Sequence, residues 1–264
     1  MLGSFYFFGK EIGYYTLMAL IGALAAGFFC YNRAKRKKLD EVKMIFLLLF
    51  SMIGVFLGAH FVFGLTNIQY FQLFAMVENF GQFIYVVSMI FGGQVFYGGL
   101  LGGIAAGAIY SKITHLDNFG GYTDCAAPAV PLFHFFGRIG CFLGGCCYGI
   151  ESEFGFTFTH SLVESANGVR RFPVQLFEAG FNLLLFFLLF IMLKKEKLKG
   201  RLFLLYLGLY APVRFGLEFL RGDTYRGYLF GLSTSQIISL GIMLVLAVYT
   251  LIKKLNKKSG KQSS

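Results

Sequence analysis

Charged residues are scarce in this sequence. They make up 14% of its 264 residues, whereas an ordinary globular domain has roughly 25%. Proline occurs only four times, while hydrophobic residues account for 56% of the chain, and the mean hydropathy is +0.66. This composition excludes a disordered chain and argues against a soluble domain.

The spacings that mark metal or redox sites are also missing. The five cysteines include no C-x-x-C pair, and no pair of histidines lies beside them. Cys146 and Cys147 are adjacent, and the other three cysteines lie in apolar surroundings. We therefore predict no metal site and no cofactor. No internal repeat or linker divides the chain, so residues 1–264 are predicted to form a single domain.

What the sequence does contain is long apolar runs. A bilayer core of about 30 Å is crossed by roughly 20 apolar residues in a helix. The runs are continuous rather than alternating, which excludes spanning strands. We predict an all-α, polytopic membrane protein with about seven transmembrane helices. The seven stretches are 12–31, 44–64, 83–110, 125–144, 174–193, 202–219 and 232–252.

Lysine and arginine gather on one side of these spans. Seventeen lie in the connections 32–43 and 194–201, in the tail 253–264 and at Lys112. The other side holds five, namely Lys10, Arg170, Arg171, Arg221 and Arg226. This asymmetry places the N-terminus outside and the C-terminus in the cytoplasm. It also predicts a small extracytoplasmic insert at about 147–172.

This charge pattern bears on partners and processing as well. The net charge of +11 is largely topogenic and suits anionic membrane lipids. Basic residues interleaved with aromatics on an exposed face would indicate nucleic-acid binding, and we predict none. Lys10 is the only basic residue before the first span. A signal peptide begins with a basic region, so we expect no cleaved signal peptide.

Four charged residues stand out inside the predicted spans: Arg138, Glu178, Arg214 and Glu218. Each costs roughly 2.5–3.5 kcal/mol at a membrane centre and marks a candidate functional site. They belong to helical faces that are otherwise polar: His134, Arg138 and Cys141; Gln175, Glu178 and Asn182; Tyr210, Arg214 and Glu218. Two explanations remain open. The network either fixes helix packing alone or lines a cavity for a ligand.

Glycine supplies a second signal. Gly99, Gly103 and Gly107 follow one another at the spacing that lets helices approach closely. Gly92-Gly93 and Gly98-Gly99 stand on either side of Tyr97. We predict there a bent, partly unwound segment that lines a cavity.

Two motifs in the chain are specific, GRIGxF at 137–142 and Y-x-x-x-R-F-x-x-E-F-x-R-x-D at 210–223. Less specific segments are FGGQVFYGGLLGG, FPVQLFEA and the Tyr15 segment IGYYTLMALIG. In order along nearly the whole chain, these segments resemble the prolipoprotein diacylglyceryl transferases of bacterial plasma membranes. The resemblance implies transfer of a diacylglyceryl group from phosphatidylglycerol to the lipobox cysteine of a preprolipoprotein signal peptide. Glycerol 1-phosphate is released.

The resemblance also implies roles for residues. Arg138 matches the essential arginine of the family, and Arg214, oriented by Glu218, matches the arginine of the sixth-span motif. Arginine in a low-dielectric site can clamp a phosphate. The predicted catalytic residues are Arg138, Arg214, Glu218 and Tyr97. The predicted substrate-binding residues are Tyr15, Gly98, Gly99, Gln175, Glu178, Tyr210 and Arg221.

The chain departs from the family pattern at several positions. Tyr97 stands in place of a histidine, Cys141 in place of an asparagine, Cys146 in place of an acidic residue and His60 in place of an arginine. A tyrosine, with an ordinary pKa near 10, is a poor base at pH 7. Two alternatives therefore stay open: a lipid-group transferase with another acceptor, and a non-catalytic lipid-binding or transport protein.

Overall fold

The computed structural model describes residues 4–161, 163–223 and 228–262. The chain forms two compact units, which are described separately. The bundle unit contains residues 1–33 and 120–264, and the glycine-hairpin unit contains residues 34–119. The expectation of a single domain stays a prediction. Arg226, counted above among the outer bases, lies outside the described residues.

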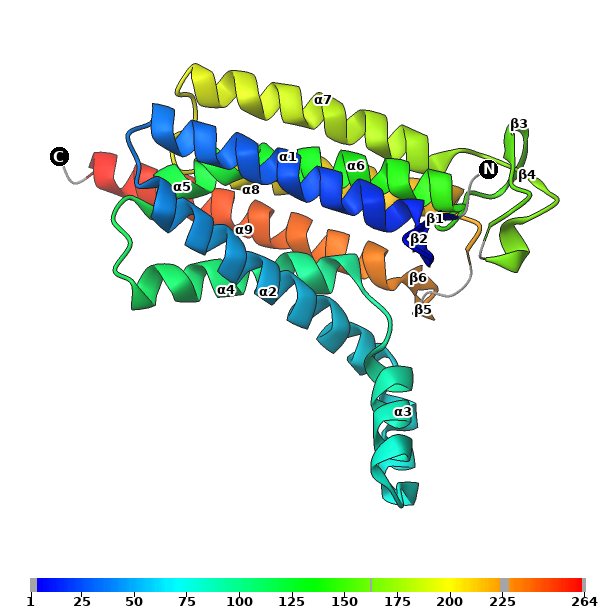
Figure 1. The fold of residues 1–264 in the computed structure, drawn as a ribbon. Helices are drawn as coiled ribbons and strands as arrows, with labels where there is room; N and C mark the ends of the chain where they lie inside the picture. Colours follow the sequence, from blue (N-terminus) through cyan, green and yellow to red (C-terminus); the bar gives the residue numbers. More distant parts are fainter. Residues whose placement is uncertain (1–3, 162, 224–227, 263–264) are drawn as a thin grey trace. The chain divides into compact units, whose positions relative to one another are not determined.

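The bundle unit is built from long helices that run roughly along one direction (Figure 1). Its elements are α1 (Tyr14–Arg36), α5 (Phe119–Ala126), α6 (Ala129–Gly144), α7 (Val174–Lys194), α8 (Leu202–Leu217), the short helix η3 (Glu218–Leu220) and α9 (Thr234–Gln262). Many large apolar side chains on them face outward, among them Phe28, Leu184 and Leu244. Such a surface is typical of helices that contact lipid.

Three short antiparallel strand pairs lie at one end of this bundle (Figure 1). They are β1 (Ser4–Phe7) with β2 (Lys10–Gly13), β3 (Glu151–Thr157) with β4 (Arg170–Arg171), and β5 (Tyr228–Leu229) with β6 (Leu232–Ser233). The predicted insert at 147–172 corresponds to β3, β4 and the short helix η2 (Glu164–Ala166). Its location outside the cell stays a prediction.

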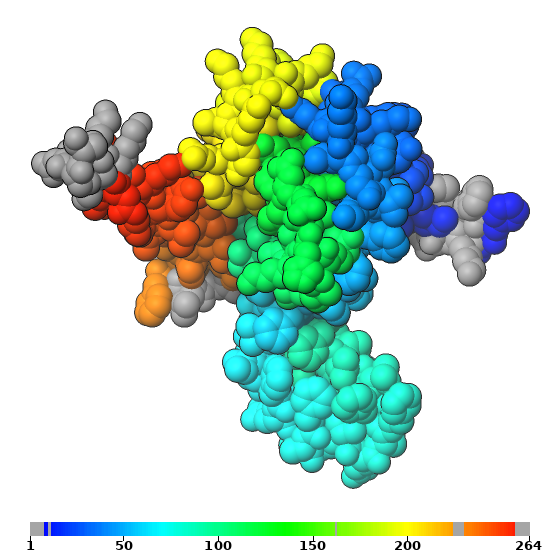
Figure 2. Space-filling view, turned by 90° about the vertical axis from the view of Figure 1, so that its left-hand side faces the viewer, coloured from blue at the N-terminus to red at the C-terminus, as the bar shows by residue number. Residues whose placement is uncertain are grey.

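At the opposite end, the connection between α7 and α8 is held by a buried acid. Asp124 of α5 accepts hydrogen bonds from the backbone N–H groups of Gly200 and Leu202. Gly200 has a φ of +73°, which glycine adopts without strain. The connection lies over α5 in the space-filling view, where it is yellow against green (Figure 2). Asp124 thus pairs the first N–H of α8, which the helix itself cannot satisfy, and fixes the loop residue just before it.

The glycine-hairpin unit pairs two long helices at close range. It comprises α2 (Glu41–Thr66), the short helix η1 (Ile68–Met76), α3 (Phe80–Phe91) and α4 (Phe96–Ile113). A Cβ on Gly58 would collide with the carbonyl oxygen of Gly98, and one on Gly54 with that of Gly102. The backbones of α2 and α4 therefore meet where only glycine fits. This confirms the predicted role of the small-residue pattern.

The third predicted span, 83–110, is not one continuous helix. α3 and α4 meet at a 96° bend across residues 92–95. The Nδ1 atom of His60 lies 2.6 Å from the carbonyl oxygen of Phe91, and its Nε2 lies 3.2 Å from the Gln94 amide. The bend was predicted, but the unwound part is shorter than expected. Gly98 and Gly99 are helical and pack against α2.

The described residues contain six helices long and apolar enough to cross a membrane, or seven if the bent pair counts as one span. This confirms the prediction of an all-α polytopic membrane protein. The fourth span was misplaced at its start. It begins at Phe119 rather than at residue 125, because α5 and α6 together form one apolar stretch. Asp124 therefore lies inside a candidate span.

Candidate functional site: a buried charged cluster

The polar faces of α6, α7 and α8 meet at Glu178, whose side chain is 1% exposed. One carboxylate oxygen, Oε2, lies 3.0 Å from Nε of Arg138. The other, Oε1, accepts a hydrogen bond of 2.8 Å from the Tyr210 hydroxyl and lies 3.4 Å from Nε2 of His134. One carboxylate of α7 thus joins three side chains from the two neighbouring helices.

A second arginine extends this network to α9. The Arg214 side chain is 2% exposed, and its Nε lies 4.0 Å from Oε1 of Glu178. Arg214 also forms an ion pair with Glu218, one turn further along the chain. Its Nη2 donates to the hydroxyl of Ser235 at 3.0 Å. We call Arg138, Glu178, Arg214 and Glu218 the charged cluster.

The charged cluster has two positive and two negative groups, all less than a tenth exposed. Pairing offsets the several kcal/mol that each buried ion would otherwise lose in hydration. Among the described residues, the hydrogen bond and the ion pair of Arg138 both use Nε. The two terminal nitrogens of its guanidinium are therefore available to an anion. A guanidinium fork of this kind suits a phosphate.

Two buried amides on α7 flank Glu178. Gln175 donates from Nε2 to the carbonyl of Cys146 at 2.9 Å, and Asn182 donates to the carbonyl of Glu178 at 2.8 Å. Within the described residues, the side-chain oxygens of both amides are buried without a hydrogen-bond partner. Since buried polar atoms normally have partners, these two oxygens are candidate acceptors for ligand hydroxyls.

Two other predicted site residues lie at the strand-bearing end of the bundle unit. Tyr15, at the start of α1, packs closely against Gly140 of α6. A Cβ added to Gly140 would lie 3.1 Å from the Cα of Tyr15. The Arg221 side chain makes two 3.0 Å hydrogen bonds to the carboxylate of Asp223. In the described structure the ion pair of Arg221 is thus with Asp223 rather than with the charged cluster.

The remaining predicted site residues, Tyr97, Gly98 and Gly99, belong to the glycine-hairpin unit. Tyr97 is 1% exposed, at the start of α4. A Cβ on Gly98 would meet the backbone of Gly58, and one on Gly99 would come within 3.2 Å of Val55. Close helix packing accounts for both glycines, and their role in binding substrate stays a prediction.

Three residues without a predicted role take part in these contacts. His134 was predicted only to share a polar helix face with Arg138, yet its Nε2 contacts both Arg138 and Glu178. Ser235 gave no signal, because serine is common at helix starts. Asp124 was overlooked because the predicted fourth span began one residue after it, and an acid at a span boundary was a detectable signal.

Comparisons with known proteins show which family this chain resembles. The family model for prolipoprotein diacylglyceryl transferase matches residues 4–252. A phosphatidylglycerol–prolipoprotein diacylglyceryl transferase of Clostridium tetani is 35% identical over 244 residues, covering 91% of this chain and 93% of that protein.

Two further relatives match almost end to end. A protein of Clostridium perfringens with the same name and the number 2 is 31% identical, covering 97% of this chain and 96% of its own length. A transferase of Campylobacter hominis is 32% identical, covering 98% and 92%. With a match that spans both specific motifs and the whole charged cluster, the chain belongs to the prolipoprotein diacylglyceryl transferase family.

Proposed function

We propose that this protein transfers the diacylglyceryl group of phosphatidylglycerol to the lipobox cysteine thiol of preprolipoproteins, a step of lipoprotein biosynthesis. One observation carries the proposal. Arg138, within the GRIG motif, is buried against Glu178 but keeps the terminal nitrogens of its guanidinium unused by the described residues. A membrane-embedded arginine poised in this way fits a lipid phosphate.

The chemistry needs stabilisation of a leaving phosphate. The acceptor sulfur attacks the glyceryl carbon, a C–S bond forms and the C–O bond to the phosphate breaks. Glycerol 1-phosphate leaves with the electron pair. Arg138 and Arg214 both lie beside Glu178 in a desolvated site. Their positive charge stabilises the negative charge that develops on the leaving phosphate. The buried oxygen of Gln175 offers an acceptor for a headgroup hydroxyl.

We further propose that the strand-bearing end of the bundle faces outward from a bacterial plasma membrane. The basic connection after α7 and the tail of α9 then lie on the cytoplasmic side, as the charge asymmetry predicts. The N-terminus is outside in this orientation. Cysteine-labelling reagents that do not cross membranes test this orientation. In intact cells, a cysteine introduced at residue 153 in β3 should be labelled, and one introduced at residue 197 after α7 should not.

The test is complementation in bacteria depleted of their resident transferase. We expect the protein to restore the mobility shift of a test lipoprotein and its labelling from phosphatidylglycerol with a radioactive diacylglyceryl group. A chain that is present and folded in the membrane but gives no labelled lipoprotein would refute the proposal.

A second candidate is transfer of the same lipid group to a different acceptor. It is favoured by the positions at which the chain departs from the family pattern, especially Tyr97 and Cys141. The same labelling experiment distinguishes it, because label would then appear in another product. Label in no product, with phosphatidylglycerol still bound, would favour a lipid-binding or transport protein.

A further inference from the structure

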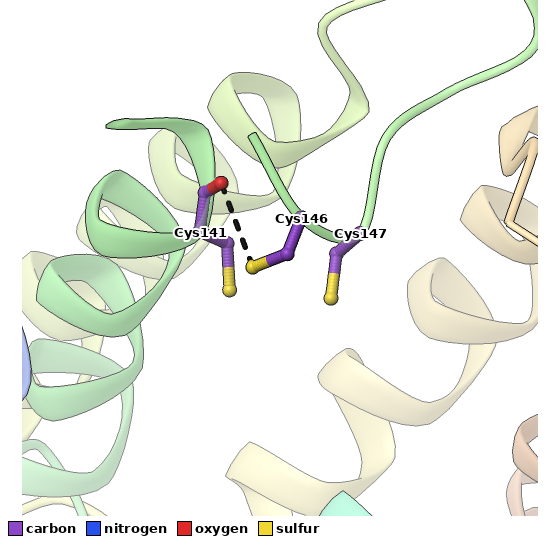
Figure 3. Close-up of side chains that lie close together, drawn as sticks. All are labelled: Cys141, Cys146 and Cys147. Atoms are coloured by element: carbon purple, nitrogen blue, oxygen red, sulfur yellow. Dashed lines mark hydrogen bonds between the residues drawn. The ribbon is translucent and has the colours of Figure 1, made fainter. Parts of the chain in front are cut away.

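Three cysteines converge beyond the charged cluster. The sulfur atoms of Cys141, Cys146 and Cys147 all lie within 4.8 Å of one another. Figure 3 shows the three side chains reaching from the end of α6 and the loop after it, with their sulfurs on the same side of the chain. All five cysteines are among the described residues, and none forms a disulfide.

The local backbone creates this convergence. α6 is capped by Gly145 in the left-handed conformation, and the N–H groups of Gly145 and Cys146 fold back to carbonyls at the end of the helix. Cys147 also has a positive φ of +57°. A non-glycine residue in this region is uncommon and often belongs to a functional site.

The loop is anchored from two sides. The hydroxyl of Ser161 donates to the carbonyls of Gly144 and Gly145, and Gln175 of α7 donates to the carbonyl of Cys146. The thiol of Cys146 donates to the carbonyl of Cys141 at 3.7 Å. The loop is thus ordered around the three thiols, whose thiolate forms bind metals.

The sulfur spacing fits a zinc ion. With Zn–S bonds of about 2.3 Å, three thiolates around one ion lie roughly 3.8–4.0 Å apart. Side-chain rotation closes the difference from the observed upper limit of 4.8 Å. Three protein ligands with a fourth position open to water or substrate are typical of catalytic rather than structural zinc.

The thiol cluster also lies close to the proposed reaction site. Cys141 follows Arg138 by three residues on α6, a rise of about 4.5 Å. Gln175, which bonds the Cys146 carbonyl, precedes Glu178 by the same interval on α7. Both helices therefore place the sulfurs about one turn beyond the Arg138–Glu178 pair, toward the strand-bearing end.

We propose that Cys141, Cys146 and Cys147 bind one Zn²⁺ ion, whose fourth position takes the thiol of the acceptor cysteine. This inference rests on the proposed function. Zinc coordination ionises a thiol, so the ion supplies the activation for which Tyr97 is poorly suited. The thiol loses its proton to water on binding. The bound thiolate then attacks the glyceryl carbon, the phosphate leaves with its electron pair, and the thioether product leaves the ion.

The first experiment measures metal on the full chain purified in lipid nanodiscs. We expect about one zinc ion per chain by mass spectrometry after dialysis against a weak chelator. Replacement with Co²⁺ should give the intense near-ultraviolet bands of sulfur-to-cobalt charge transfer. Cys147→Ala should lose the metal, whereas Cys147→His, which keeps a ligand, should retain cobalt with a weaker charge-transfer band.

The matched control removes a cysteine elsewhere. Cys30→Ala in α1 lies outside the cluster and should leave the zinc content unchanged. The proposal is overturned by a wild-type chain without zinc, by a zinc content that Cys147→Ala leaves intact, or by a Cys146–Cys147 disulfide in the purified protein.

The second experiment separates the open position from the proposed function. A lipobox peptide should increase the charge-transfer band of the cobalt form, and the same peptide with serine for cysteine should not. No change with the cysteine peptide would overturn the assignment of the fourth ligand. A change without lipid transfer would support the zinc site and count against the proposed function alone.

Discussion

The Nε atom of Arg138 lies 3.0 Å from Oε2 of Glu178, and both side chains are almost wholly buried. This pair links α6 to α7 at the level where α8 contributes Tyr210 and Arg214. The carboxylate keeps the guanidinium charged and in place, since a lone arginine inside an apolar bundle would be costly. The pair therefore holds one edge of the guanidinium while the other edge can meet an anion.

Arg138→Lys tests whether that second edge matters. Lysine keeps the charge but not the planar fork, so we expect the transfer rate to fall by about 100-fold or more. The amount of protein in the membrane should change little. Initial rates with labelled phosphatidylglycerol measure the loss, and Arg170→Lys, at the exposed position of strand β4, is the control. A rate close to wild type for Arg138→Lys would contradict a role in holding phosphate.

Tyr210→Phe removes the hydroxyl that donates to Glu178. Hydrogen bonds to charged groups contribute about 1.5–3 kcal/mol, so we expect the free energy of unfolding to fall by that order. Unfolding in mixed micelles by added denaturing detergent measures the change. Tyr249→Phe, on an exposed position of α9, is the matched control and should be neutral. Equal effects of the two variants would show that the Tyr210 hydroxyl does not stabilise the cluster.

Gly58→Ala tests the contact between α2 and α4. The added methyl group would collide with the carbonyl oxygen of Gly98, and overpacking of this kind typically costs about 1–3 kcal/mol. We expect a lower thermal midpoint and less protein in the membrane. Gly180→Ala on α7 meets no atom within 4 Å and should be neutral or slightly stabilising. A tolerated Gly58→Ala would mean that the helices can separate without loss.

Asp124→Asn tests the link between α5 and the start of α8. Asparagine has one acceptor oxygen, so one of the N–H groups of Gly200 and Leu202 would lose its partner. An unsatisfied buried donor costs about 1–3 kcal/mol, and we expect the free energy of unfolding to fall by that order. Transfer per folded molecule should be retained. Asp117→Asn, on an exposed residue, is the control, and a fall in rate without a fall in stability would contradict a purely structural role.

Much of the architecture follows from composition and period alone. Twenty-residue apolar runs must form helices in a bilayer, because no water is present there to satisfy the backbone. Polar residues spaced three and four apart must share a helix face, which is why the polar faces around Arg138, Glu178 and Arg214 were predictable. These three faces meet at Glu178 because an unpaired charge inside the membrane would cost several kcal/mol of free energy.

Only the tertiary structure decided the contacts that no local rule governs. Asp124 holds a loop 76 residues further along the chain, and such a pairing depends on how the helices pack. The thiol cluster was missed for another reason. Cys141 lies in the last turn of α6. Residue spacing along a helix predicts which side chains share a face, but not which side chains meet after the chain reverses direction. The left-handed Gly145 and Cys147 turn that chain back, and the reversal brings the three sulfurs together.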